Sequence, residues 1–219
     1  MHITRTIRAT LVTASLLTLP GASGAGAQGV PRDPAAPREF TVDFETSAGR
    51  FALHVERSWA PLGADRLFAL VTKGFYDGTR FHRVVPGFGV QFGISRDPRV
   101  SRIWRLARLG VDRVRRSNKA MFVAFAAGMG PDTRTTQLFI NLADNPALDR
   151  EGFAPVGWIT DGQDVVKRLY SGYWGHGAHE DEPEQWRMQT EGLAYLLREY
   201  PRLDYVVTAT IRSPASSHD

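Results

Sequence analysis

The sequence predicts a single, mainly β domain. Residues 81–85 and 88–92 form two short strand patterns joined by a Pro86-Gly87 turn, and residues 40–44 and 50–55 form a second strand pair. Without its ends, the 219-residue chain has the length of one domain with one well-buried core. It contains no cysteine, so we expect neither disulfide cross-links nor a cysteine nucleophile.

The first 27 residues are predicted to be a secretory signal peptide and not part of the fold. Arg5 and Arg8 precede an apolar run from Ala9 to Leu19, and Ala25-Gly26-Ala27 has the small residues of a cleavage site. The apolar run is short for a permanent membrane anchor, although an uncleaved tether is the alternative. We therefore expect cleavage after Ala27 and export, to the periplasm or to the medium.

The rest of the chain divides into a short leader, one domain and a tail. Residues 28–38 contain three prolines among small residues and are predicted to be a flexible leader to a domain at 39–213, with a disordered tail at 214–219. After the first strand pair, the sequence predicts, in order, a helix at about 60–73, the strands at 81–92, a strand at 153–159, a helix from 163 to about 170, an added helix at about 186–200 ended by Pro201, and a strand at 205–211.

A basic segment interrupts the domain at about 95–119. It carries eight arginines and Lys119 together with Ile103, Trp104, Leu106 and Leu109. Such a patch could bind nucleic acid or anionic lipid. The formal charge of +4, however, falls to about +2 without Arg5 and Arg8, and the codon bias of a GC-rich genome would explain the excess of arginine over lysine. We interpret the segment as a solvated insert whose apolar residues pack on the domain, and predict no nucleic-acid or membrane partner after signal cleavage.

The strand-turn-strand at 81–92 has the most informative side-chain pattern of the chain. If side chains alternate between the faces, Phe81, Arg83 and Val85 share one face, and the turn lets Phe88 and Gln91 approach Arg83. A cationic fork beside an aromatic ring and an amide can grip an extended peptide. An ordinary buried hairpin with a stray arginine is the alternative.

Two runs of sequence resemble the signatures of the cyclophilin-type peptidyl-prolyl cis-trans isomerases. The first is Phe-His-Arg-Val-Val-Pro-Gly-Phe-Gly-Val-Gln at 81–91, and the second is Gly-Pro-Asp-Thr-Arg-Thr-Thr-Gln-Leu-Phe-Ile-Asn at 130–141. Two signatures in the right order are far more specific than one, and the resemblance covers about 39–170 and the last strand. It implies a closed antiparallel β-barrel of about eight strands with a helix capping each end, to which the segment at about 171–202 adds one helix.

The resemblance also implies the site. Arg83 is the expected catalytic residue, and Phe88, Phe139 and Leu148 are expected to hold the proline ring, unless these three are plain core residues. The other expected substrate-binding residues are Gln91, Ala127, Gly128, Gln137 and Phe153. Isomerisation breaks no covalent bond, so no metal or cofactor is expected. The donors between His176 and Glu182 could hold a divalent metal, but we interpret them as a polar surface loop.

Some positions depart from the family pattern. Gly89 stands where many members have methionine, Ala147 where a tryptophan or phenylalanine is common, and the arginine-rich segment replaces a glycine-rich loop. We expect these changes to leave the fold and peptide binding intact and to affect the catalytic rate and the substrate preference. Without a tryptophan at Ala147, cyclosporin is expected to bind weakly. The sequence predicts a monomeric, exported peptidyl-prolyl isomerase that acts on proline-containing polypeptides, and the alternative is a non-catalytic peptide-binding module or chaperone with a degenerate pocket.

Overall fold

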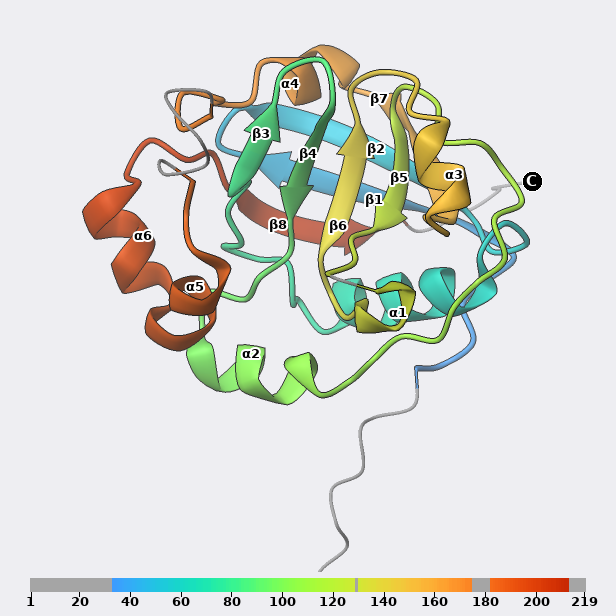
Figure 1. Ribbon diagram of the computed structural model, residues 1–219, viewed down its shortest axis with the longest axis horizontal. Coiled ribbons are helices and arrows are strands. Elements are labelled where there is room, and N and C mark those ends of the chain that lie inside the picture. Colours follow the sequence, from blue (N-terminus) through green and yellow to red (C-terminus); the bar gives the residue numbers. More distant parts are fainter. Residues whose placement is uncertain (1–32, 129, 175–181, 213–219) are drawn as a thin grey trace, which may run out of the picture.

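The computed structural model describes residues 33–128, 130–174 and 182–212, and one antiparallel sheet forms its centre (Figure 1). The strands pair in the order β3-β4-β6-β5-β7-β2-β1-β8. Eight antiparallel strands confirm the expected mainly β fold. The strands are β1 (Glu39–Thr46), β2 (Gly49–Glu56), β3 (Arg83–Val85), β4 (Gly89–Phe92), β5 (Phe122–Phe125), β6 (Leu138–Asn141), β7 (Pro155–Asp161) and β8 (Val206–Ile211).

The sheet is curled but open, so the closed barrel expected from the resemblance is wrong. β3 and β8 are the two ends of the pairing order. They approach each other just before each strand begins, where Arg80 and Tyr205 form an isolated antiparallel bridge and the Phe81 amide donates to the Asp204 carbonyl at 2.9 Å. Among the described residues, this bridge does not continue as a ladder between β3 and β8.

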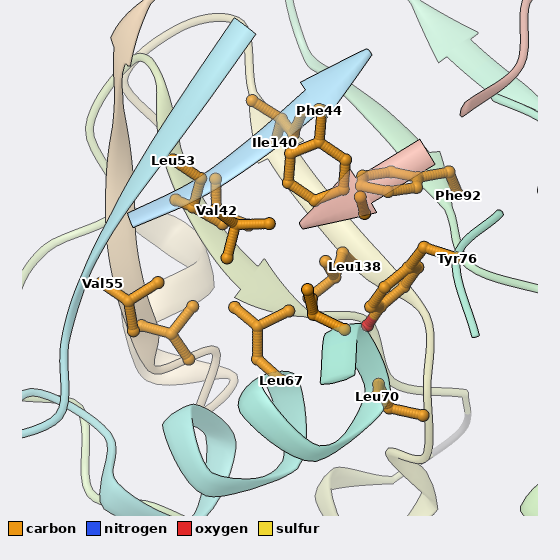
Figure 2. Packing of buried hydrophobic residues seen from close by; sticks show 14 of the residues in the cluster. Val42, Phe44, Leu53, Val55, Leu67, Leu70, Tyr76, Phe92, Leu138 and Ile140 are labelled. Carbon is orange, nitrogen blue, oxygen red and sulfur yellow. The ribbon is translucent and has the colours of Figure 1, made fainter. Parts of the chain in front are cut away.

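Helices cover the two ends of the curled sheet. The helix expected at 60–73 is α1 (Pro61–Thr72), and α4 (Gln163–Lys167) is shorter than expected and lies at the opposite end (Figure 1). Figure 2 shows Leu67 and Leu70 of α1 among strand residues such as Leu138, and all three side chains are fully buried. The described chain also contains α2 (Pro98–Arg105), the short 3-10 helix η1 (Pro131–Thr133), α3 (Ala147–Arg150), α5 (Gln185–Glu191) and α6 (Leu193–Glu199).

The arginine-rich insert packs on the domain through only some of its apolar residues. Trp104, Ala107 and Leu109 are buried, as expected. Ile103 and Leu106, however, are 60% and 70% exposed. These two side chains lie on the outer side of the insert, so the expectation that its apolar residues all pack inward is corrected for them.

Polar contacts fasten the insert to α1. The buried guanidinium of Arg66 donates to the Ala107 carbonyl at 2.8 Å. In the other direction, the Asp112 carboxylate accepts from the backbone amides of Leu62 at 3.1 Å and Gly63 at 2.8 Å. Asp112 thereby caps the N-terminus of α1, which has no capping side chain of its own.

The segment at 171–202 adds two helices where the sequence predicts one. α5 ends and α6 begins at Gly192, whose φ of +66° leaves the helical region. A Cβ there would lie 2.6 Å from the Arg96 carbonyl, so this close approach also requires glycine. The segment has a small core of its own, formed by Ile94, Met188, Tyr195, Leu196 and Leu203.

The last residues of the predicted leader contact the domain. The Asp33 carboxylate accepts from Arg66 Nε at 2.7 Å, and the amide of buried Ala36 donates to Asp65 at 2.8 Å. The predicted signal peptide, residues 28–32 and the predicted tail lie outside the described residues. Within 33–128, 130–174 and 182–212, every helix is too short or too polar to cross a membrane.

Candidate functional site

The hairpin of β3 and β4 places Arg83 beside two of the expected site residues. Arg83 pairs with Gln91 across the two strands, and Gln91 in turn pairs with Phe139 of β6. The guanidinium carbon of Arg83 lies 5.9 Å from the centre of the Phe88 ring. A cation, an aromatic ring and an amide are therefore brought together on one hairpin, with Phe88 in the turn and Arg83 and Gln91 at its other end.

Phe81 does not share the face of Arg83, so this prediction is wrong. Phe81 is fully buried in the core, with its ring 4.9 Å from that of Phe92. The strand begins only at Arg83, so the alternation of faces does not extend back to Phe81. Within the strand, Val84 belongs to the core cluster and Arg83 does not.

A groove with amide side chains adjoins the hairpin. Gln91 Nε2 donates to Gln137 Oε1 at 2.7 Å, and Gln137 Nε2 donates to Gln185 Oε1 at 3.2 Å. These side chains, with Ala127 and Gly128, line a cavity of about 190 Å³ whose other walls include Arg105 and Gln189. Four expected peptide-binding residues are thus brought together, between walls that the inserted helices α2 and α5 supply.

Phe139 fills the space left by the missing side chain at Gly89. The Phe88 and Phe139 rings lie 5.5 Å apart, and Phe139 is buried. An ideal Cβ on Gly89 would lie 2.1 Å from Cε2 of Phe139. The ring of Phe139 therefore occupies the space that a side chain at position 89 would take.

We predict that Gly89→Ala destabilises the protein by about 1–3 kcal/mol, because the new methyl group overlaps the Phe139 ring and the neighbouring strand cannot yield freely. Urea unfolding measures the change. Since Phe139→Leu removes part of the ring, the double variant should recover stability relative to Gly89→Ala. A Gly89→Ala protein as stable as the parent would contradict the packing described for Phe139.

The remaining two expected residues lie around α3. The Phe153 amide donates to the Leu148 carbonyl at 3.0 Å, and Leu148 is buried. Asn145, just before α3, donates through Nδ2 to the Phe88 carbonyl at 2.9 Å, which ties α3 to the Phe88 turn. The Asn145 side chain thus links the hairpin to the chain segment that carries Leu148 and Phe153.

Arg134 is a buried arginine that the sequence analysis did not single out. Its guanidinium lies 5.0 Å from the centre of the Phe153 ring and donates to the Gly152 carbonyl at 2.7 Å. Burial lowers the pKa of Arg134 from its ordinary value. Its position within the second signature run is the signal that could have identified it.

His82 lies directly before β3 and points into the interior. Its side chain is buried, and burial lowers its pKa from the ordinary 6.5 to about 4. The imidazole is therefore neutral at neutral pH.

The buried His82 predicts a pH dependence of stability. Between about pH 6.5 and pH 4 the unfolded chain binds a proton on His82 that the folded chain does not, so stability present above pH 6.5 is lost as the pH falls. We expect His82 to contribute a loss of about 3 kcal/mol at pH 4, measured by urea unfolding across this range. His82→Gln cannot titrate and should show a correspondingly shallower slope; parallel slopes for both proteins would contradict the burial.

Two residues from the added segment contact Arg83, and the sequence analysis assigned neither to this site. It interpreted Glu182 as part of a polar surface loop, whereas the Glu182 side chain is only 19% exposed and lies against Arg83. Glu182 Oε1 lies 3.2 Å from Arg83 Nε, and the Trp174 ring centre lies 4.9 Å from the guanidinium carbon. Neither belongs to a signature run, so no local pattern marks them. The donors from His176 to Asp181, interpreted above as a polar loop, lie outside the described residues.

One other group of metal-type donors occurs in the described part of the chain. Donor atoms of Glu39, His54 and Glu56 lie within 4.8 Å of one another. His54 Nε2 lies 3.9 Å from the Glu39 carboxylate, a cross-strand ion pair when the histidine is protonated. These residues lie on β1 and β2, whereas the site described above is built on β3, β4 and β6.

Comparison with known families matches the chain over residues 41–189 to the family described as "Cyclophilin type peptidyl-prolyl cis-trans isomerase/CLD". A peptidyl-prolyl cis-trans isomerase of Streptomyces antibioticus is 35% identical over 158 residues, which are 66% of this chain and 92% of the relative. Peptidyl-prolyl cis-trans isomerase B of Escherichia coli is 29% identical over 157 residues, covering 66% and 93%.

Solved structures resemble the fold at lower sequence identity. A cyclophilin of Hirschia baltica aligns with a TM-score of 0.59 and 19% identity, covering 85% of this chain and 79% of that one. A cyclophilin-type isomerase of Cryptosporidium parvum, crystallised in the presence of the dipeptide Ala-Pro, aligns with a TM-score of 0.56 and 19% identity, covering 80% and 99%. The curled antiparallel sheet is thus an architecture shared with cyclophilins.

Proposed function

The chain belongs to the cyclophilin-type peptidyl-prolyl cis-trans isomerases and has their activity. We propose that Arg83 is its catalytic residue. We also propose that its substrates are exported proteins. The observation that carries the assignment is the meeting of Arg83, Phe88 and Gln91 at one hairpin, beside a groove of amides. Each residue acts on a different part of an extended X-Pro peptide.

Arg83 acts on the bond that turns. The barrier to rotation, about 18–20 kcal/mol, comes from conjugation of the prolyl nitrogen with the preceding carbonyl. As the bond twists, the nitrogen becomes pyramidal and its lone pair can accept a hydrogen bond. A guanidinium that donates to this lone pair stabilises the twisted form over both planar forms, which is the condition for catalysis.

One hydrogen bond does not supply the whole effect. Shortening an exchange of about 10–100 s to about 10 ms requires roughly 4–5 kcal/mol of barrier. A hydrogen bond from a charged donor contributes about 1.5–3 kcal/mol. The remainder is assigned to apolar surroundings, because a twisted amide is less polar than a planar one and is favoured where water is excluded.

The other expected residues hold the peptide. The apolar surface for the proline ring is provided by Phe88, Phe139, Leu148 and Phe153. Gln91, Gln137 and the backbone at Ala127 and Gly128 hold the chain on the side of the amide-lined cavity. The use of Ala-Pro with the crystallised isomerase of Cryptosporidium parvum supports proline-containing peptides as partners of this chain.

A protease-coupled assay on a panel of tetrapeptides that differ in the residue before proline tests the proposal. Turnover above the uncatalysed rate is expected for several of them, and the dependence of the rate on peptide concentration gives KM. Binding of the same peptides without any acceleration would instead support the alternative of a non-catalytic peptide-binding module or chaperone.

The proposed export predicts the N-terminus of the mature protein. In a Gram-negative host we expect the recovered chain to begin at Gln28, as the free or cyclised residue, because Ala25 and Ala27 satisfy the small-residue requirement of signal peptidase. Mass mapping of the N-terminal peptide from the periplasmic fraction measures it. A chain that keeps Met1 and fractionates with membranes would contradict the proposal and favour a tether.

A further inference from the structure

Arg83 is enclosed by the segment at 171–202 as well as by the hairpin. Glu182 Oε1 lies 3.2 Å from its Nε, and the guanidinium carbon lies 4.9 Å from the Trp174 ring and 5.9 Å from the Phe88 ring. A carboxylate and two aromatic rings therefore surround one guanidinium, and only Phe88 belongs to the signature motif.

The contact with Glu182 compensates for the removal of Arg83 from water. The side chains of Arg83 and Glu182 are 25% and 19% exposed. A charge this far withdrawn from solvent needs an opposite charge nearby, and attraction between the two is stronger than at a fully hydrated surface. Without the carboxylate, the flexible arginine side chain would lower its free energy by turning toward water.

The ion pair is made through the nitrogen nearest the stem. Glu182 Oε1 lies at ion-pair distance from Nε but accepts no hydrogen bond from it, so the carboxylate attracts the guanidinium by charge and draws it to this side of the site. A ring within about 6 Å of the cation further favours one orientation of the guanidinium plane. The guanidinium is thus held between one carboxylate and two aromatic rings.

We propose that Glu182 and Trp174 are positioning residues that orient Arg83 for the prolyl nitrogen. The inference rests on the proposed catalytic role of Arg83. A donor displaced by about 1 Å can cost about a hundredfold in rate, so two contacts that fix its direction bear directly on catalysis. This chain therefore completes its site with a segment outside the family signatures.

A purely structural role for Glu182 is disfavoured by the packing of the added segment. That segment has its own core, in which Met188, Tyr195 and Leu196 of α5 and α6 pack with Ile94 and Leu203. Glu182 precedes α5 and is not part of this core. Its removal should leave both helices in place, and far-ultraviolet circular dichroism and thermal unfolding can verify this.

The test is a double-mutant cycle on the full mature chain, with exchange rates and peptide affinity measured by NMR on an Ala-Pro tetrapeptide. Glu182→Ala and Trp174→Ala are each expected to lower kcat by about tenfold with KM changed less than twofold, because neither is assigned to the peptide. In an Arg83→Ala background, assayed at higher enzyme concentration, Glu182→Ala should change the residual rate less than twofold, since its effect passes through Arg83.

Conservative and matched variants sharpen the result. Trp174→Phe keeps a ring and should retain more activity than Trp174→Ala. Glu182→Gln keeps the shape of the side chain but removes its charge, so it should lose about as much activity as Glu182→Ala. Glu184→Gln is the matched control, because it removes a charge of the same sign two residues away. The Glu184 side chain contacts Trp186 and not Arg83, so this variant should be as active as the parent protein.

Three outcomes overturn the proposal. The first is an unchanged kcat in Glu182→Ala, and the second is a rise in kcat in this variant, which would mean that Glu182 competes with the peptide for Arg83. The third is that Glu182→Ala lowers kcat equally in the parent and in the Arg83→Ala background. The catalytic assignment fails separately, through an active Arg83→Ala protein. An inactive Arg83→Ala protein beside a fully active Glu182→Ala protein defeats only the positioning role.

Discussion

Arg83→Ala is expected to lower kcat/KM by at least about a hundredfold, equivalent to about 3 kcal/mol of transition-state stabilisation. The guanidinium is assigned to the twisted amide and not to the planar one, so most of the loss should be in kcat. The protease-coupled assay, with the NMR exchange experiment for slow variants, measures the effect.

The controls separate chemistry from folding. Arg83→Ala leaves the partly buried carboxylate of Glu182 without its partner, so a stability loss on the order of 1–3 kcal/mol is expected and the assay belongs well below the unfolding midpoint. Arg83→Lys keeps the charge but not the planar fork and should be strongly impaired as well. Arg150→Ala, at an exposed arginine of α3, should be as active as the parent. A folded Arg83→Ala protein within threefold of parent activity would remove Arg83 from the mechanism.

The elements that the sequence predicted well depend on local patterns. The strand pair at 40–55 and the helix at 60–73 appear in the structure as β1, β2 and α1, because alternation and helical spacing are visible within one short stretch. The turn at Pro86-Gly87 is also visible locally. The local pattern does not show where the strand begins, and for this reason Phe81 was assigned to the wrong face.

The features that the sequence did not predict are set by contacts between distant segments. Whether the sheet closes depends on how β3 meets β8, more than a hundred residues later, and no local pattern in either strand reveals it. The break at Gly192 depends on the Arg96 carbonyl, which approaches from the other insert. A helix pattern with one glycine is compatible with a continuous helix until that neighbour is known.

The same reasoning applies to the site. Arg83, Phe88 and Gln91 stand within nine residues of one another, so a hairpin is enough to assemble them. Glu182 and Trp174 reach Arg83 only because the added segment folds back over the edge of β3. The need for glycine at position 89 is likewise explained only by Phe139, which lies on the neighbouring strand β6.

Cyclosporin is expected to bind this protein at least about a hundredfold more weakly than it binds cyclophilins that have a tryptophan in place of Ala147. In such relatives the indole N–H is expected to donate to the drug while the ring packs on it. Ala147 is the exposed first residue of α3, beside buried Leu148, and offers neither contact. An aromatic ring contributes on the order of 150 Å² of contact and the hydrogen bond about 1 kcal/mol, which together exceed a hundredfold in affinity. Titration calorimetry measures the difference.

The reverse substitution tests the reason for the weak binding. Ala147→Trp should recover part of the affinity, because the start of α3 is exposed and a large side chain there meets no packed neighbour in the core. Asp144→Trp, on the same loop before α3, places an equal ring at an exposed position that is not expected to contact the drug, and should recover none. Proline peptides are held by Arg83, Phe88 and Gln91 and should be turned over by all three proteins. Nanomolar inhibition of the parent protein by cyclosporin would show that Ala147 does not occupy the tryptophan position, and the assignment of Leu148 to the proline pocket would fail with it.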